Sequence, residues 1–82
     1  MKDSIPLKKD YTNNSLLVVN PQGKIRRIYV PFRVLCIKGT GSIVANAWVY
    51  VQQISMNINN QLIYFIAGEF HVYDSFRIFI NF

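Results

Sequence analysis

Few side chains in this sequence could support catalysis, and they are scattered along the chain. The thiol, imidazole and carboxyl groups belong to Cys36, His71, Asp3, Asp10, Glu69 and Asp74. Thiolate attack needs a base beside the nucleophile and a third group that orients the base, so a Cys–His–Asp arrangement would be required. Cys36, however, lies in the apolar run 34–37, which favours a buried structural thiol.

The other polar groups also have simpler interpretations. In the predicted sheet His71 faces Ile66 and Ile78, which favours a hydrogen-bonded histidine in the core or at an interface. Asp74 and Ser75 are typical of a turn, and the segment 39–42 lacks the Gly-Lys-Ser/Thr sequence of a phosphate-binding loop. A structural zinc site needs four ligands, mostly Cys and His, and the chain has one of each. We therefore predict a protein that is not an enzyme and that uses no cofactor and no metal.

Size and composition indicate one all-β domain. The chain has 82 residues, of which 51% are hydrophobic and 15% aromatic. That length suits one domain, and that apolar content is too high for intrinsic disorder. Because β-branched and aromatic residues dominate while helix formers are scarce, strands are expected.

Turn signals divide the chain further. Residues 1–15 are polar and show no periodicity, so they are predicted to form a flexible N-terminal arm. Residues 16–82 are predicted to form the domain, with strands that include 24–30, 32–38 and a long bent strand over 43–54. Turns about every 8–12 residues predict a partly open barrel of five to six antiparallel strands, of SH3-like or OB-like size. Counting strands does not separate these two strand orders.

The last third of the chain predicts a meander. Gly68 and Glu69 match the two central residues of a type II′ hairpin, which would pair Ala67 with Phe70. A second tight turn at residues 74–75 would bring residues 76–80 back alongside. The face expected in the core consists of Leu62, Tyr64, Ile66, His71, Tyr73, Phe76, Ile78 and Ile80. The opposite face consists of Ile63, Phe65, Ala67, Phe70, Val72, Arg77, Phe79 and Asn81.

That opposite face is too apolar for a solvated surface, because a half-exposed sheet alternates apolar with polar residues. Something must cover Phe65, Phe70, Val72 and Phe79: the N-terminal arm, other strands or another subunit. Each covered aromatic would contribute about 1.5–3 kcal/mol. We therefore predict a non-enzymatic protein-interaction module that forms a homo-oligomer through these residues.

The charge distribution gives an alternative. The net charge is +5, with +6 in residues 1–41 and −1 in residues 42–82. Two neighbouring predicted strands carry five basic residues, with the aromatic residues Tyr29 and Phe32 between them. The basic residues are Lys24, Arg26, Arg27, Arg33 and Lys38. Basic groups neutralise phosphates and aromatic rings stack on bases, so this set could bind nucleic acid. The same residues could instead guard an exposed strand against aggregation, and strand alternation splits them between two faces.

Two further observations complete the expectations. Trp48 and Tyr50 lie on one side of their predicted strand, as core packing or as part of a peptide-binding groove. The N-terminus has no apolar run of secretory length, and Asn and Gln residues interrupt the uncharged stretch 39–68. A cytoplasmic protein is expected, with no membrane partner and no small-molecule substrate.

Overall fold

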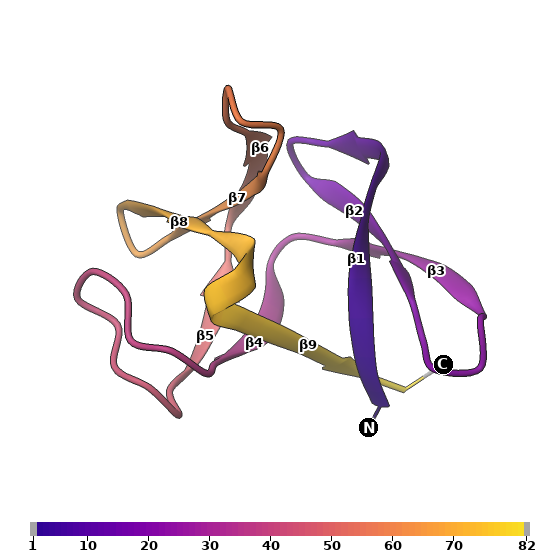
Figure 1. The fold of residues 1–82 in the computed structure, drawn as a ribbon, viewed down its shortest axis with the longest axis horizontal. Helices are drawn as coiled ribbons and strands as arrows, with labels where there is room; N and C mark the ends of the chain where they lie inside the picture. Colours follow the sequence, from indigo (N-terminus) through magenta and orange to yellow (C-terminus); the bar gives the residue numbers. More distant parts are fainter. Residues whose placement is uncertain (1, 82) are drawn as a thin grey trace.

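A computed structural model describes residues 2–81 and confirms an all-β, partly open barrel (Figure 1). Within these residues the chain forms nine strands and one short 3-10 helix, η1. Their bounds are β1 (Lys2–Thr12), β2 (Ser15–Val19), β3 (Ile25–Tyr29), β4 (Phe32–Cys36), β5 (Trp48–Val51), β6 (Gln53–Met56), β7 (Leu62–Ile66), β8 (Glu69–Val72), η1 (Tyr73–Ser75) and β9 (Phe76–Ile80). Among the described residues, no helix is long and apolar enough to cross a membrane.

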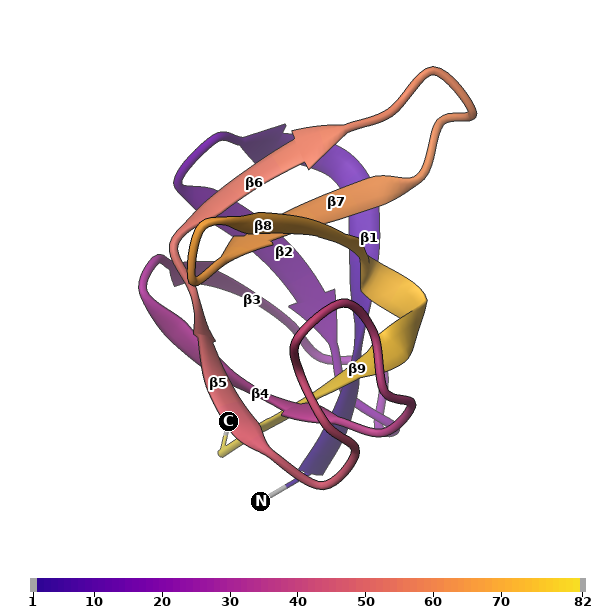
Figure 2. The ribbon, with the colours of Figure 1, turned by 90° about the vertical axis from the view of Figure 1, so that its left-hand side faces the viewer.

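The strands form two antiparallel sheets. The larger has the order β3-β2-β1-β9-β4-β5, and the smaller has the order β6-β7-β8 (Figure 2). The chain leaves the large sheet after β5 and returns through η1 into β9, which pairs with β1 and also with β4. Strands from the two ends of the sequence therefore lie side by side in the large sheet.

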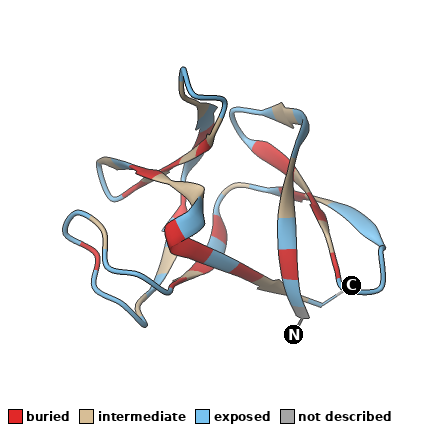
Figure 3. Cartoon of the chain, viewed as in Figure 1, coloured by how far each residue is buried: buried red, intermediate tan, exposed pale blue. Residues whose placement is uncertain are grey.

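The core fills the space between the sheets. Along β4 and β9 buried residues alternate with more exposed ones, as strand geometry requires (Figure 3). Tyr64 of β7 lies at the centre, with its ring centroid 6.0 Å from Phe32 and 6.0 Å from Phe76. The small sheet and the large sheet thus share one interior.

The structure corrects the prediction of a flexible arm over residues 1–15. Residues 2–12 form β1, which lies between β2 and β9. Ser4 is buried while Asp3 and Ile5 are exposed, Ile5 at 65%, so side chains alternate at the start of this strand. Backbone pairing on both edges holds β1 in place, and such pairing depends little on side-chain type.

The predicted hairpin register is also wrong. Ala67 and Gly68 have φ values of 51° and 83°, the pattern of a type I′ turn, and Ile66 therefore pairs with Glu69. Tyr64 consequently pairs with His71 and not with Tyr73. Because the partner changes by two residues, and side chains alternate with a period of two, the residues of β7 and β8 stay on the sides of the hairpin predicted for them. The predicted core face is correct: its members are buried, apart from the partly buried Tyr73 and Ile80.

Two further predictions about strand arrangement fail. β9 does not return beside β8, because η1 turns the chain into the large sheet. The single strand expected over residues 43–54 is divided: Asn46 has a φ of 71°, and at Gln52 the chain passes from one sheet to the other. The Gln52 backbone N–H donates to Phe65 O at 2.8 Å, so this junction lies beside β7.

Candidate functional site

The small sheet presents an apolar outer face. Cross-strand pairing joins Phe65 with Phe70 and Ile63 with Val72. The Phe65 and Phe70 rings lie 4.8 Å apart at an interplanar angle of 52°, and Phe70 is 67% exposed. We name this surface, with the neighbouring residues of β6, the aromatic face; it consists of Gln53, Ser55, Ile63, Phe65, Phe70 and Val72. None of its members carries a charge.

Phe79, predicted to belong with these residues, lies elsewhere. It projects from the outer face of the large sheet, with its ring centroid 6.1 Å from that of Trp48. The Arg33 guanidinium lies over the Trp48 ring, 4.4 Å from its centroid, and Arg33 pairs across the strands with Tyr50. We name Arg33, Trp48, Tyr50 and Phe79 the Trp48 cluster. The predicted interface is therefore divided between two surfaces.

The structure separates the predicted basic residues. Lys24 precedes β3, and Arg26 and Arg27 lie on β3, at one end of the large sheet. Arg33 lies on β4, with β2, β1 and β9 between it and β3, and Lys38 lies in the loop after β4. These side chains do not share one face of paired strands.

Two of the basic side chains also have partners within the fold. Arg27 Nη1 donates to Asp10 O and to Ser15 Oγ, each at 2.9 Å. Arg26 Nη1 donates to the backbone carbonyl of Asn81. Because β3 ends the six-stranded sheet, its charges are placed where they can discourage pairing with another sheet. Tyr29, 65% exposed, projects from the same strand.

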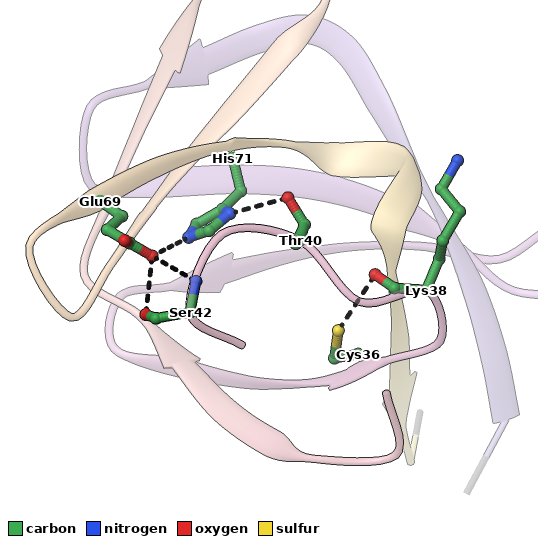
Figure 4. A network of polar contacts seen from close by, with 6 residues as sticks. All are labelled: Cys36, Lys38, Thr40, Ser42, Glu69 and His71. Atoms are coloured by element: carbon green, nitrogen blue, oxygen red, sulfur yellow. Dashed lines mark hydrogen bonds and ion pairs between the residues drawn. The ribbon is translucent and has the colours of Figure 1, made fainter. Parts of the chain in front are cut away.

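A polar network joins the loop after β4 to β8 (Figure 4). Thr40 Oγ1 lies 3.1 Å from His71 Nδ1, in hydrogen-bond contact. The backbone N–H and the hydroxyl of Ser42 both donate to Glu69 Oε1, at 3.2 and 2.9 Å. The same carboxylate oxygen lies 3.3 Å from His71 Nε2. The network therefore fastens residues 40–42 to the edge of the small sheet.

The electrostatics of this network favour a charged carboxylate. Hydrogen bonds from Ser42, first from its backbone N–H and then from its hydroxyl, lower the pKa of Glu69, and nearby His71 lowers it further. Although His71 Nε2 faces this carboxylate, it makes no well-aligned hydrogen bond to any described group. A short distance with poor alignment is a weak interaction. The Ser42 contacts are therefore the stronger part of the network.

The order hydroxyl–imidazole–carboxylate resembles a catalytic relay, but the imidazole is closed off. His71 is 4% exposed, and its ring packs against Phe76 with centroids 5.7 Å apart. Gly41 lies so close that a Cβ built on it would be 2.9 Å from His71 Cε1. The prediction of a hydrogen-bonded, buried histidine is confirmed.

The remaining reactive groups are not assembled either. Cys36 is buried, and its Sγ contacts Lys38 O at 3.3 Å (Figure 4). Within residues 2–81, no group of three or more His, Cys, Asp or Glu side chains could hold a metal ion. No family model, no curated protein and no solved structure matches this chain.

Proposed function

We propose that this domain is a non-enzymatic protein-interaction module that associates with a second copy of itself through the aromatic face. The carrying observation is Phe70, which is 67% exposed and whose ring contacts that of Phe65 on a surface without charge. Large exposed apolar patches are typical of interaction sites. We also propose that the protein is located in the cytoplasm, as the sequence predicts.

The charge of the protein favours the aromatic face over other surfaces. In a two-fold dimer the same surface of both copies forms the contact, so a surface with a net charge is repelled by its own copy. The protein carries a net charge of +5, but none of the charged residues belongs to the aromatic face. A contact through the Trp48 cluster, by contrast, would include the positive charges of two Arg33 side chains.

The size of the domain supports the same proposal. At 82 residues, its expected free energy of unfolding is about 4–12 kcal/mol. Small domains gain stability by oligomerisation when disulfides and metals are lacking. Cys36 is the only cysteine in the sequence, so an internal disulfide does not supply that stability.

Light scattering after size-exclusion chromatography tests the proposal. The Phe70→Asp variant places a charge at the proposed contact, and Tyr29→Asp is the matched control on an edge strand of the other sheet, at 65% exposure. We expect dimers for the wild type and for the control, and monomers for Phe70→Asp. A monomeric wild type at high protein concentration, or a dimer unaffected by Phe70→Asp, contradicts the proposal.

The milder Phe70→Ala variant gives a quantitative expectation. About two-thirds of Phe70 is exposed and would be buried by the second copy. This burial corresponds to a binding free energy of about 1–2 kcal/mol per copy. Both copies contribute in a symmetric contact, so the dimer dissociation constant rises about 30- to 900-fold. A nucleic-acid site formed jointly by Lys24, Arg26, Arg27, Tyr29, Arg33 and Lys38 is not proposed as a second function, because these side chains are dispersed and Arg27 is engaged within the fold.

A further inference from the structure

The Trp48 cluster combines exposed rings with a cation. Trp48 and Tyr50 are 43% and 58% exposed, and both lie on β5, the end strand of the large sheet. Arg33 lies on the neighbouring strand β4, where it pairs with Tyr50 across the strands and its guanidinium lies over the Trp48 ring. Phe79 supports Trp48 from β9. Four residues from three strands therefore form a surface that is both aromatic and positively charged.

We propose that the Trp48 cluster is a binding site for single-stranded nucleic acid. Bases stack on the Tyr50 ring and on the Arg33 guanidinium, which lies over the Trp48 ring at 4.4 Å from its centroid. Phosphates contact Arg33 and Arg77, which lies on the same outer face of β9 and pairs across the strands with Leu35. The site is separate from the aromatic face, so the two proposals are independent.

The chemistry of the cluster selects this ligand. Bases in a single strand expose their faces, and stacking on aromatic or guanidinium planes is the usual means of binding them. In a duplex those faces are already stacked on neighbouring bases. A proline-rich peptide would use the rings but gain nothing from a net charge of +5.

Arg77 is available to an anionic ligand. Its guanidinium lies 3.5 Å from the Asp3 carboxylate, and both side chains are about half exposed. Exposed ion pairs of this kind are weak and easily screened, so a phosphate competes with Asp3 for Arg77.

The fluorescence of Trp48 provides the test, because it is the only tryptophan in the sequence. The full chain is titrated with a short oligothymidylate at several salt concentrations. We expect quenching of Trp48, with a log–log salt slope of about −1.4 for two phosphate contacts with a single strand. Repeating the titration with Phe70→Asp tests whether dimerisation affects binding. We expect this variant to bind the oligonucleotide as well as the wild type does.

Three variants assign the contact to the cluster. Tyr50→Ala removes one stacking surface and weakens binding about 5- to 150-fold. Arg33→Lys keeps the charge but loses the planar guanidinium group. The affinity for the oligonucleotide should therefore fall, while the log–log salt slope should not change. Tyr29→Ala, which removes an equally exposed ring from β3, leaves binding unchanged. Far-ultraviolet circular dichroism confirms that each variant retains the fold.

Three results overturn the proposal. The first is the absence of both binding and quenching in the wild type. The second is binding that Tyr29→Ala weakens and Tyr50→Ala does not, which places the contact on β3. The third is stronger and salt-independent quenching by an uncharged proline-rich peptide, which identifies a peptide-binding surface instead.

Discussion

Gly41 offers a sharp test of the polar network that fastens the loop to β8. Its φ is +54°, and a Cβ at this position would lie 2.7 Å from Glu69 Oε1 and 2.9 Å from His71 Cε1. Gly68, with a φ of +83° and no atom within 4 Å of the corresponding position, is the matched control. Alanine at either position incurs the left-handed backbone cost, about 1–2 kcal/mol.

The two variants differ in the crowding that they cause. Gly68→Ala should lower the free energy of unfolding by the backbone cost alone. Gly41→Ala should lose a further 1–3 kcal/mol or so, the usual effect of overpacking, because the buried His71 ring has little room to move. Urea denaturation with a single cooperative transition measures both values. Equal losses for the two variants would refute the close packing of Gly41 against His71.

Three other predictions follow from the same structure. Glu69→Gln removes a carboxylate whose pKa is lowered in the folded state, so its contribution exists above the unfolded-state pKa and is lost as the pH falls through the folded-state pKa. The stability difference between wild type and Glu69→Gln should therefore shrink between pH 6 and pH 3, and a difference independent of pH in chemical denaturation contradicts this. Phe76→Ala should cost about 3–5 kcal/mol in denaturant unfolding, because Phe76 is buried against Tyr64 and His71; a cost below about 1 kcal/mol is incompatible with that packing. Cys36 should react with a thiol reagent only after unfolding, and rapid labelling of the native protein would show that it is accessible.

The sequence predicts the fold class and the buried face of the last third well. Period-two alternation decides which face is inward, and it is insensitive to a change of two residues in the pairing. Leu62, Tyr64, Ile66 and His71 are buried as predicted even though their hairpin partners differ from those expected. The lone cysteine and histidine also have the structural environments that their apolar neighbours indicate.

Strand order was harder to predict, because it depends on contacts between distant parts of the chain. Nothing near Asp74 in the sequence indicates that η1 sends β9 to the large sheet, which moves Phe79 away from Phe65. β1 was missed because its backbone, more than its side chains, holds it between β2 and β9. The contact between the Arg33 guanidinium and the Trp48 ring likewise requires β4 and β5 to be paired, although the alternation of Trp48 and Tyr50 is a partial signal of it.

Methyl NMR spectra recorded over a dilution series test the proposed self-association most directly. The methyl groups of Ile63 and Val72 lie on the aromatic face, whereas those of Ile5 and Ile25 lie on the outer face of the large sheet. The proposal predicts that the Ile63 and Val72 signals shift with protein concentration while the Ile5 and Ile25 signals stay constant. Signals that are independent of concentration at Ile63 and Val72, or shifts confined to Ile5 and Ile25, would contradict it.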